Sequence, residues 1–133
     1  MKEPHRSRPV YAGAALLTVG LGLATRPLKH VWDAGGSALG DALWAVLVYL
    51  LLGIAFPRLC AWRVAIAATL VAWAVEFSQL WHPAWLNTLR RTTFGALAIG
   101  GTFSVGDLCC YTVGTMTIYI VERITAGVKR HRI

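Results

Sequence analysis

The sequence predicts an all-α integral membrane protein with about four transmembrane helices, plus a short interfacial or re-entrant helix between the third and fourth. Of the 133 residues, 56% are hydrophobic and 14% are charged, whereas a soluble domain carries about a quarter charged residues. Apolar runs recur along the chain, and the charged residues concentrate at the ends and between these runs. This pattern indicates one membrane domain spanning residues 1–133.

The N-terminal part reads as a short polar segment followed by a first membrane helix. We expect residues 1–8 to form a basic cytoplasmic N-terminus, residues 9–121 a helical membrane bundle, and residues 122–133 a basic cytoplasmic tail that is frayed. The first helix is predicted at Val10–Ala24. This run resembles a signal-peptide core, but Arg26-Pro27-Leu28-Lys29 is a poor cleavage context.

The next two predicted helices are separated by clear breakers. A loop with Pro27, glycines and Asp33 is expected over Arg26–Ser37. A second helix follows at Ala38–Phe56 and ends at Pro57. The third helix is predicted at Ala61–Trp81.

The apolar stretch from Thr92 to Val121 is too long for one crossing. As a single helix it would reach about 45 Å, beyond a hydrocarbon core of about 30 Å. Gly100-Gly101 is the natural break. We therefore expect the short helix at Asn87–Ile99 and a fourth spanning helix at Thr102–Val121.

The basic residues predict the orientation of the chain in a bacterial inner membrane. If both termini are cytoplasmic, nine basic residues lie inside and four outside, as the positive-inside rule favours. The nine are Lys2, Arg6, Arg8, Arg58, Arg63, Arg123, Lys129, Arg130 and Arg132. The four are Arg26, Lys29, Arg90 and Arg91. The prediction is a multi-pass protein with an N-in, C-in topology.

This topology brings polar residues of several helices to one depth near the outer face. Asp41 falls in the first turn of the second helix, Glu76 near the end of the third and Asp107 near the start of the fourth. Ionisable groups inside a membrane need partners. We expect the acids to pair with Arg90, Arg91 or Arg26, or to hydrogen-bond to Tyr111, Gln79 or a tryptophan indole; an acid without such a partner is protonated. The candidate binding residues, or polar cluster, are Asp41, Trp44, Glu76, Gln79, Arg90, Asp107 and Tyr111.

Three functions fit this cluster. It is a pocket for a lipid headgroup or cell-envelope partner without catalysis, the site of a membrane enzyme, or a structural clamp between helices. The enzyme would act on a lipid-phosphate or polyprenyl-phosphate, with Glu76 or Asp107 as general base and Arg90 on the phosphate. No nucleophile stands beside a base, so no catalytic residue is assigned and we lean towards a protein that is not an enzyme.

Other partners are not predicted. The basic residues form no stripe with interleaved aromatics, so the net charge of +7 is read as topology and not as nucleic-acid binding. Cys60, Cys109 and Cys110 show no metal-ligand spacing, so we expect no metal and no cofactor. Membrane lipids are the expected surroundings, and oligomerisation stays open.

Three sequence blocks also resemble a known family. GDALWAVLVYLLLG (Gly40–Gly53), VEFSQLWHPAWLNTLRRTTFGALAIGGTF (Val75–Phe103) and DLCCYTVG (Asp107–Gly114) are similar to the bacterial domain-of-unknown-function 2809 (DUF2809) membrane proteins. The resemblance covers about Gly20 to Gly114. It implies fold and membrane location but no activity. The matching positions are Gly40, Asp41, Trp44, Glu76, Gln79, Leu80, Arg90, Gly95, Gly100, Phe103, Asp107, Tyr111 and Gly114. More distantly, the ExxQ…R…G pattern is similar to VanZ-like proteins.

Overall fold

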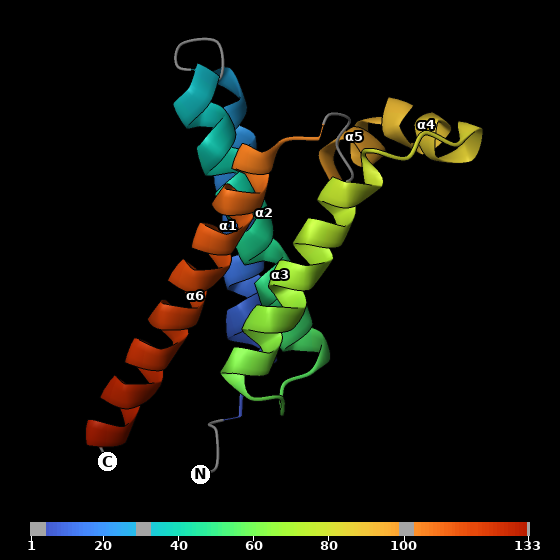
Figure 1. The fold of residues 1–133 in the computed structure, drawn as a ribbon. Coiled ribbons are helices and arrows are strands. Elements are labelled where there is room, and N and C mark those ends of the chain that lie inside the picture. The colour runs from blue at the N-terminus through green and yellow to red at the C-terminus, as the bar shows by residue number, and fades with distance from the viewer. Residues whose placement is uncertain (1–4, 29–32, 99–102, 133) are drawn as a thin grey trace.

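The computed structural model describes residues 5–28, 33–98 and 103–132, and within these ranges the regular structure is entirely α-helical. Four long helices run alongside one another, and two short helices lie at one end of the bundle (Figure 1). The long helices are α1 (Arg8–Leu28), α2 (Asp33–Ala55), α3 (Ala61–Ser78) and α6 (Val105–His131), and the short ones are α4 (Ala84–Arg91) and α5 (Thr93–Ala98). The all-α prediction is confirmed.

The predicted helix boundaries differ from the structure most at the start of α2 and the end of α6, and by up to four residues in α1, in α3 and at the start of α6. α2 begins at Asp33 and not at Ala38, so part of the predicted loop is helix. Glycines disfavour a helix by about 1 kcal/mol each, but packing along α1 offsets such a cost. α6 continues to His131, through the tail that was expected to fray. A contact of Glu122, described below, holds this extension.

The predicted short helix at Asn87–Ile99 is instead a pair of helices that turn at Thr92. The Thr92 backbone is extended, and its hydroxyl oxygen accepts a 2.9 Å hydrogen bond from the backbone N–H of Gly95. A Cβ atom at Gly95 would lie 1.7 Å from the Leu89 carbonyl oxygen, so glycine alone fits this corner. The predicted break at Gly100-Gly101 lies outside the described residues.

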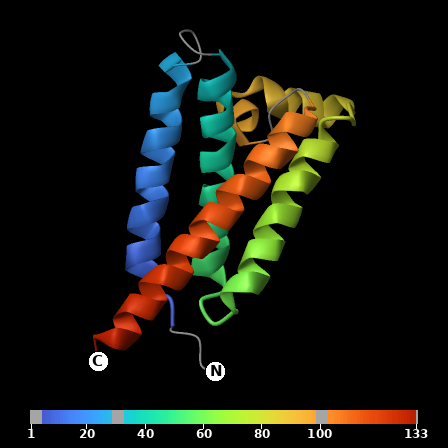
Figure 2. The ribbon, with the colours of Figure 1, turned by 60° about the vertical axis from the view of Figure 1, so that its left-hand side comes forward.

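Helix α2 is central to the bundle. It packs against α1, α3 and α6, and α6 also crosses α3 (Figure 2). One core cluster contains Tyr49, Val64, Ala65 and Ala68. Ala65 and Ala68 are small, and small residues at a helix interface let the backbones approach closely.

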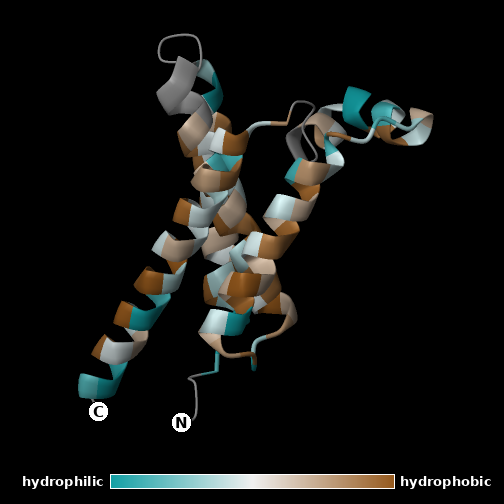
Figure 3. Cartoon of the chain, in the orientation of Figure 1, coloured by the Kyte–Doolittle hydropathy of each residue, from teal (hydrophilic) through white to brown (hydrophobic). Residues whose placement is uncertain are grey.

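All four long helices carry exposed large apolar side chains, and Figure 3 shows hydrophobic residues interspersed with polar ones along these helices. Large apolar side chains more than half exposed include Leu16, Leu17, Leu51, Ile66, Leu70, Val113 and Ile124. By length and hydropathy alone, two helices could cross a membrane, over Ala38–Ala55 and Ala61–Ser78. The remaining described helices do not meet that criterion, so two of the four predicted spans are supported by it.

The two ends of the bundle differ in what they carry. Both chain termini and the turn between α2 and α3 lie at one end, which we call the terminal end (Figure 1). The helices α4 and α5 lie at the other end, beside the start of α6. This arrangement is the one that four successive antiparallel helices require.

Candidate functional site

The carboxylate of Glu76 is completely buried in the last turns of α3. Its Oε1 atom accepts a 2.7 Å hydrogen bond from the backbone N–H of Ser104, just before α6. Its Oε2 atom accepts a 2.9 Å hydrogen bond from the Tyr111 hydroxyl. Both oxygens therefore tie α3 to α6. A negative charge at this position also interacts favourably with the N-terminus of α6.

Tyr111 contacts both Glu76 of α3 and Trp44 of α2. Its ring lies 5.4 Å from the ring of Trp44, centroid to centroid. The charges of Asp41 and Asp107 act on its hydroxyl together with that of Glu76. Helices α2, α3 and α6 thus bring Trp44, Glu76 and Tyr111 into contact. Asp41 and Asp107 are near enough for their charges to act on Tyr111, and we call these five residues the Glu76 cluster.

Asp41 occupies a different helix position from the one expected. It was placed in the first turn of α2, but the helix begins at Asp33, about two turns earlier. The favourable effect of the helix N-terminus fades after the first turn. The helix dipole therefore does not account for the half-buried position of Asp41 in the Glu76 cluster.

Gln79 follows Glu76 at the end of α3. Its side chain is buried, and its backbone N–H donates to the Glu76 carbonyl oxygen as the helix terminates. Gln79 thus lies one turn from Glu76, as the sequence predicted.

Arg90 does not form the predicted Arg–carboxylate pair within the described residues. Its guanidinium donates to the carbonyl oxygens of Ser78 at 2.7 Å and Trp81 at 2.9 Å, and to the Asn87 side chain at 3.2 Å. The last carbonyls of a helix lack intrahelical partners, and an arginine nearby satisfies them. Arg90 therefore joins α4 to the end of α3 and is not part of the Glu76 cluster.

A second polar cluster lies at the terminal end and was missed by the sequence reading. The Arg6 guanidinium forms a 2.9 Å ion pair with Glu122 and donates a 2.5 Å hydrogen bond to the Leu59 carbonyl oxygen. The Tyr49 hydroxyl donates to the other oxygen of Glu122. We call these four residues the Arg6–Glu122 latch, because they join the N-terminal segment, α2, the α2–α3 turn and α6.

The latch is buried and its charges are matched. The Arg6 side chain is 4% exposed and that of Glu122 is 16% exposed. Burial alone lowers the pKa of Arg6, but the hydrogen bond and charge of Glu122 outweigh it, so the pKa is raised overall. The guanidinium is therefore held in its charged form.

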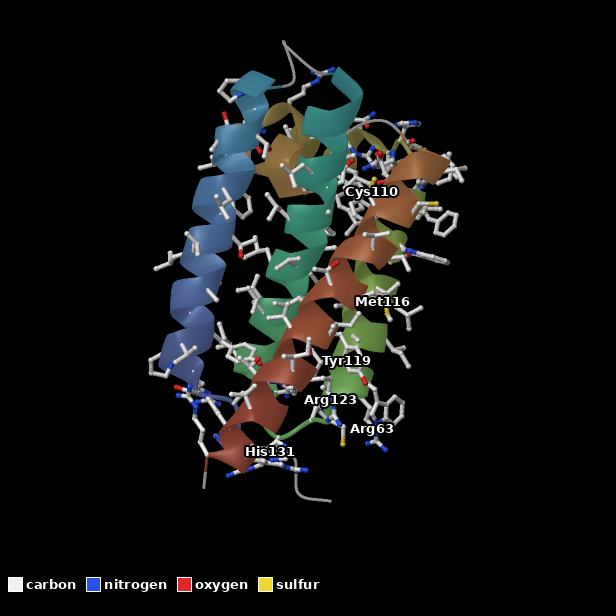
Figure 4. The ribbon with its side chains drawn as sticks, turned by 90° about the vertical axis from the view of Figure 1, so that its left-hand side faces the viewer. Arg63, Cys110, Met116, Tyr119, Arg123 and His131 are labelled. Carbon is white, nitrogen blue, oxygen red and sulfur yellow. The ribbon has the colours of Figure 1, made fainter. Side chains whose placement is uncertain are left out.

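Helical spacing was the signal that could have revealed the latch. Tyr111, Thr115 and Glu122 are four and then seven residues apart, a spacing that places them on one face of a helix. Tyr111 and Thr115 are buried, and this face points into the bundle. The extent of α6 is visible in Figure 4, from Cys110 near the α4–α5 end to Arg123 and His131 near the terminal end. Residue 122 had been assigned to the tail, so the continuity of the face was overlooked.

The described residues do not form a metal site at the Glu76 cluster. No group of three His, Cys, Asp or Glu side chains among them is arranged to hold a metal ion. A pocket among the described residues is lined by Arg123, Ala126, Gly127 and Arg130, in the part of α6 beyond Glu122 and away from Tyr111.

The fold and its buried polar contacts define a class: a small all-α protein whose helices are joined by a buried carboxylate–tyrosine cluster. The chain belongs to the DUF2809 family, described as proteins of unknown function, whose family model matches residues 32–115. The matched region contains the whole Glu76 cluster, and it agrees with the family predicted from the sequence blocks. No solved structure matches the chain.

Proposed function

We propose that this chain is a multi-pass protein of the bacterial inner membrane, crossed by α1, α2, α3 and α6. The exposed apolar side chains on all four helices support this proposal. Removing one such side chain from water is worth about 1.5–3 kcal/mol. A bilayer would remove these apolar side chains from water, whereas in water their exposure would cost a large free energy of solvation.

The proposed orientation places both termini in the cytoplasm. The terminal end carries Arg58, Arg63, Arg123, Lys129, Arg130 and Arg132. The opposite end carries Arg26, Arg90 and Arg91 among the described basic residues. This imbalance has the sign that the positive-inside rule requires for an N-in, C-in protein.

Within this membrane bundle, the proposed role of the Glu76 cluster is structural: it clamps α3 and α6 against α2 near the outer face. The observation that carries the proposal is that both oxygens of the fully buried Glu76 are hydrogen-bonded to the protein itself. A ligand would have to displace these bonds before it could reach the carboxylate. Of the roles considered, the clamp needs no such rearrangement, and it makes the protein a scaffold without catalysis.

The proposal is tested by locating the chain and its C-terminus in bacterial cells. We expect the protein to stay in the membrane pellet after alkaline carbonate extraction. A fluorescent protein fused after residue 133 should fluoresce, because this reporter works in the cytoplasm. Alkaline phosphatase fused at the same position should be inactive, because it works only outside the cytoplasm. A phosphatase fused after residue 98, beyond α5, is the matched control and should be active. Release by carbonate or the reverse fusion pattern would refute the proposal.

A further inference from the structure

The helices α4 and α5 are the part of the molecule whose packing is least explained by the bundle. Among the described residues, α4 and α5 pack against each other and against no other helix. They extend sideways from the end of α3, across the direction of the long helices (Figure 1). The bundle itself therefore leaves much of their surface uncovered.

The uncovered surface is apolar on one side. Trp85 is 58% exposed and Leu89 is 46% exposed. These two residues are four apart in α4 and so lie side by side on the helix. Phe94 on α5 is 81% exposed, and Trp81, just before α4, stacks edge-on against Trp85 at 5.7 Å. These exposed side chains are large and apolar, and water solvates such surface poorly.

The other side of α4 is polar and basic. Arg91 is exposed and lies on the side of the helix away from Trp85 and Leu89, beside Thr88. The Arg90 guanidinium donates hydrogen bonds to the carbonyl oxygens of Ser78 and Trp81, at and just after the end of α3, and this contact fixes the direction of α4. Arg26, in the last turn of α1, adds an exposed positive charge at the same end of the molecule. The acids at this end, Asp41, Glu76 and Asp107, are buried or half-buried, so the exposed charges here among the described residues are those of the arginines.

We propose that α4 and α5 form a surface element that lies in the membrane–water interface and binds anionic phospholipid headgroups of the outer leaflet. A short helix with tryptophans on one side and arginine on the other has the composition of an interfacial helix. Trp81, Trp85, Leu89 and Phe94 enter the acyl boundary, and Arg91 contacts the phosphates. The exposed Arg91 and Arg26 favour anionic lipid as the occupant over a neutral surface. This inference rests on the proposed membrane location.

The test uses the full chain in lipid nanodiscs made of phosphatidylcholine alone or mixed with phosphatidylglycerol. Hydrogen–deuterium exchange of the peptide covering residues 84–98 is compared between the two. One basic residue near an anionic surface contributes enough binding free energy to slow opening about five-fold. We therefore expect about five-fold slower exchange of this peptide in the discs that contain phosphatidylglycerol.

Matched variants assign the effect to the arginine. Arg91→Gln should abolish the difference between the two lipids, whereas Arg58→Gln, an exposed arginine at the terminal end, should leave it unchanged. Trp85→Ala should speed exchange of the peptide in both lipids. Equal exchange of the unmodified protein in both lipids would overturn the inference. Protection that rises with protein concentration would also overturn it, since a second copy of the chain would then be the occupant.

The same experiment separates this inference from the proposed function. If peptides of α2 and α3 are strongly protected in the discs and only residues 84–98 fail to respond to phosphatidylglycerol, the membrane location stands and the headgroup site falls. If the chain does not stay with the discs, the membrane location falls first.

Discussion

Glu76 shows how one buried acid is made tolerable by two local donors. A buried carboxylate without partners is strongly destabilising, and hydrogen bonds to a charged group are worth about 1.5–3 kcal/mol each. The Tyr111 hydroxyl and the Ser104 N–H supply these bonds from the α6 side. The Glu76 carboxylate therefore holds the start of α6 next to the end of α3.

At this scale we predict that Glu76 and Tyr111 are energetically coupled. Tyr111→Phe should lower the free energy of unfolding by about 1.5–3 kcal/mol, because one oxygen of a buried carboxylate loses its donor. The loss in the double variant with Glu76→Gln should be smaller than the sum of the single losses. Unfolding of the purified protein in mixed detergent micelles measures all four corners of the cycle.

Tyr119→Phe is the matched control, since Tyr119 is a half-buried tyrosine of the same helix that packs in the other core cluster. Its effect should be well below that of Tyr111→Phe. Strictly additive losses for Glu76→Gln and Tyr111→Phe would mean that their hydrogen bond does not contribute to the clamp.

Between elements, glycines set how closely the helices approach. A Cβ atom at Gly114 would lie 2.3 Å from the Ala42 carbonyl oxygen, so α6 crosses α2 in direct backbone contact. The same crossing places Tyr111, one turn earlier in α6, against Trp44 of α2. The geometry of the Glu76 cluster therefore depends on a residue that has no side chain.

We expect Gly114→Ala to destabilise the protein by about 1–3 kcal/mol, because the added methyl group collides with backbone and the helices must move apart. Gly127→Ala in the same helix is the control, since a Cβ atom there meets nothing within 4 Å. It should be neutral or stabilise by up to about 1 kcal/mol through helix propensity. Thermal unfolding that ranks the two variants in the opposite order would contradict the close crossing.

Across the whole molecule, α6 is held at both ends by a carboxylate–tyrosine contact. Near α4 and α5 the acid is Glu76 of α3, and at the terminal end it is Glu122 of α6 itself, paired with Arg6 and Tyr49. The latch joins residues more than a hundred positions apart in the chain. It closes the N-terminal segment over the bundle and explains why α6 remains helical beyond residue 121.

We predict that Arg6→Met lowers the free energy of unfolding by about 3 kcal/mol, because it leaves Glu122 buried without its cation. Hydrogen–deuterium exchange of residues 122–131 should become faster in this variant, as the end of α6 loses its anchor. Lys129→Gln, an exposed change in the same segment, should leave that exchange as it is. Unchanged exchange in Arg6→Met would show that α6 is stable without the latch.

The sequence by itself determined the helical class and the order of the helices, and all five residues of the Glu76 cluster are among its candidates. These follow from local properties: apolar runs, breakers such as Pro57, and the spacing of Asp107 and Tyr111 on one helix face. Each of these signals lies within a few residues of the feature that it predicts. For that reason the acids could be placed at one end of the bundle without knowing any contact.

Only the tertiary structure decided the partners of the arginines. Arg90 has a long side chain that reaches several acceptors. It donates to the carbonyl oxygens of Ser78 and Trp81 in place of a carboxylate. The pairing of Arg6 with Glu122 depends on how the two chain ends meet, which no local pattern encodes. An ion pair is a property of distance in space, so helix periodicity could indicate the face on which Glu122 lies but not the cation that meets it there.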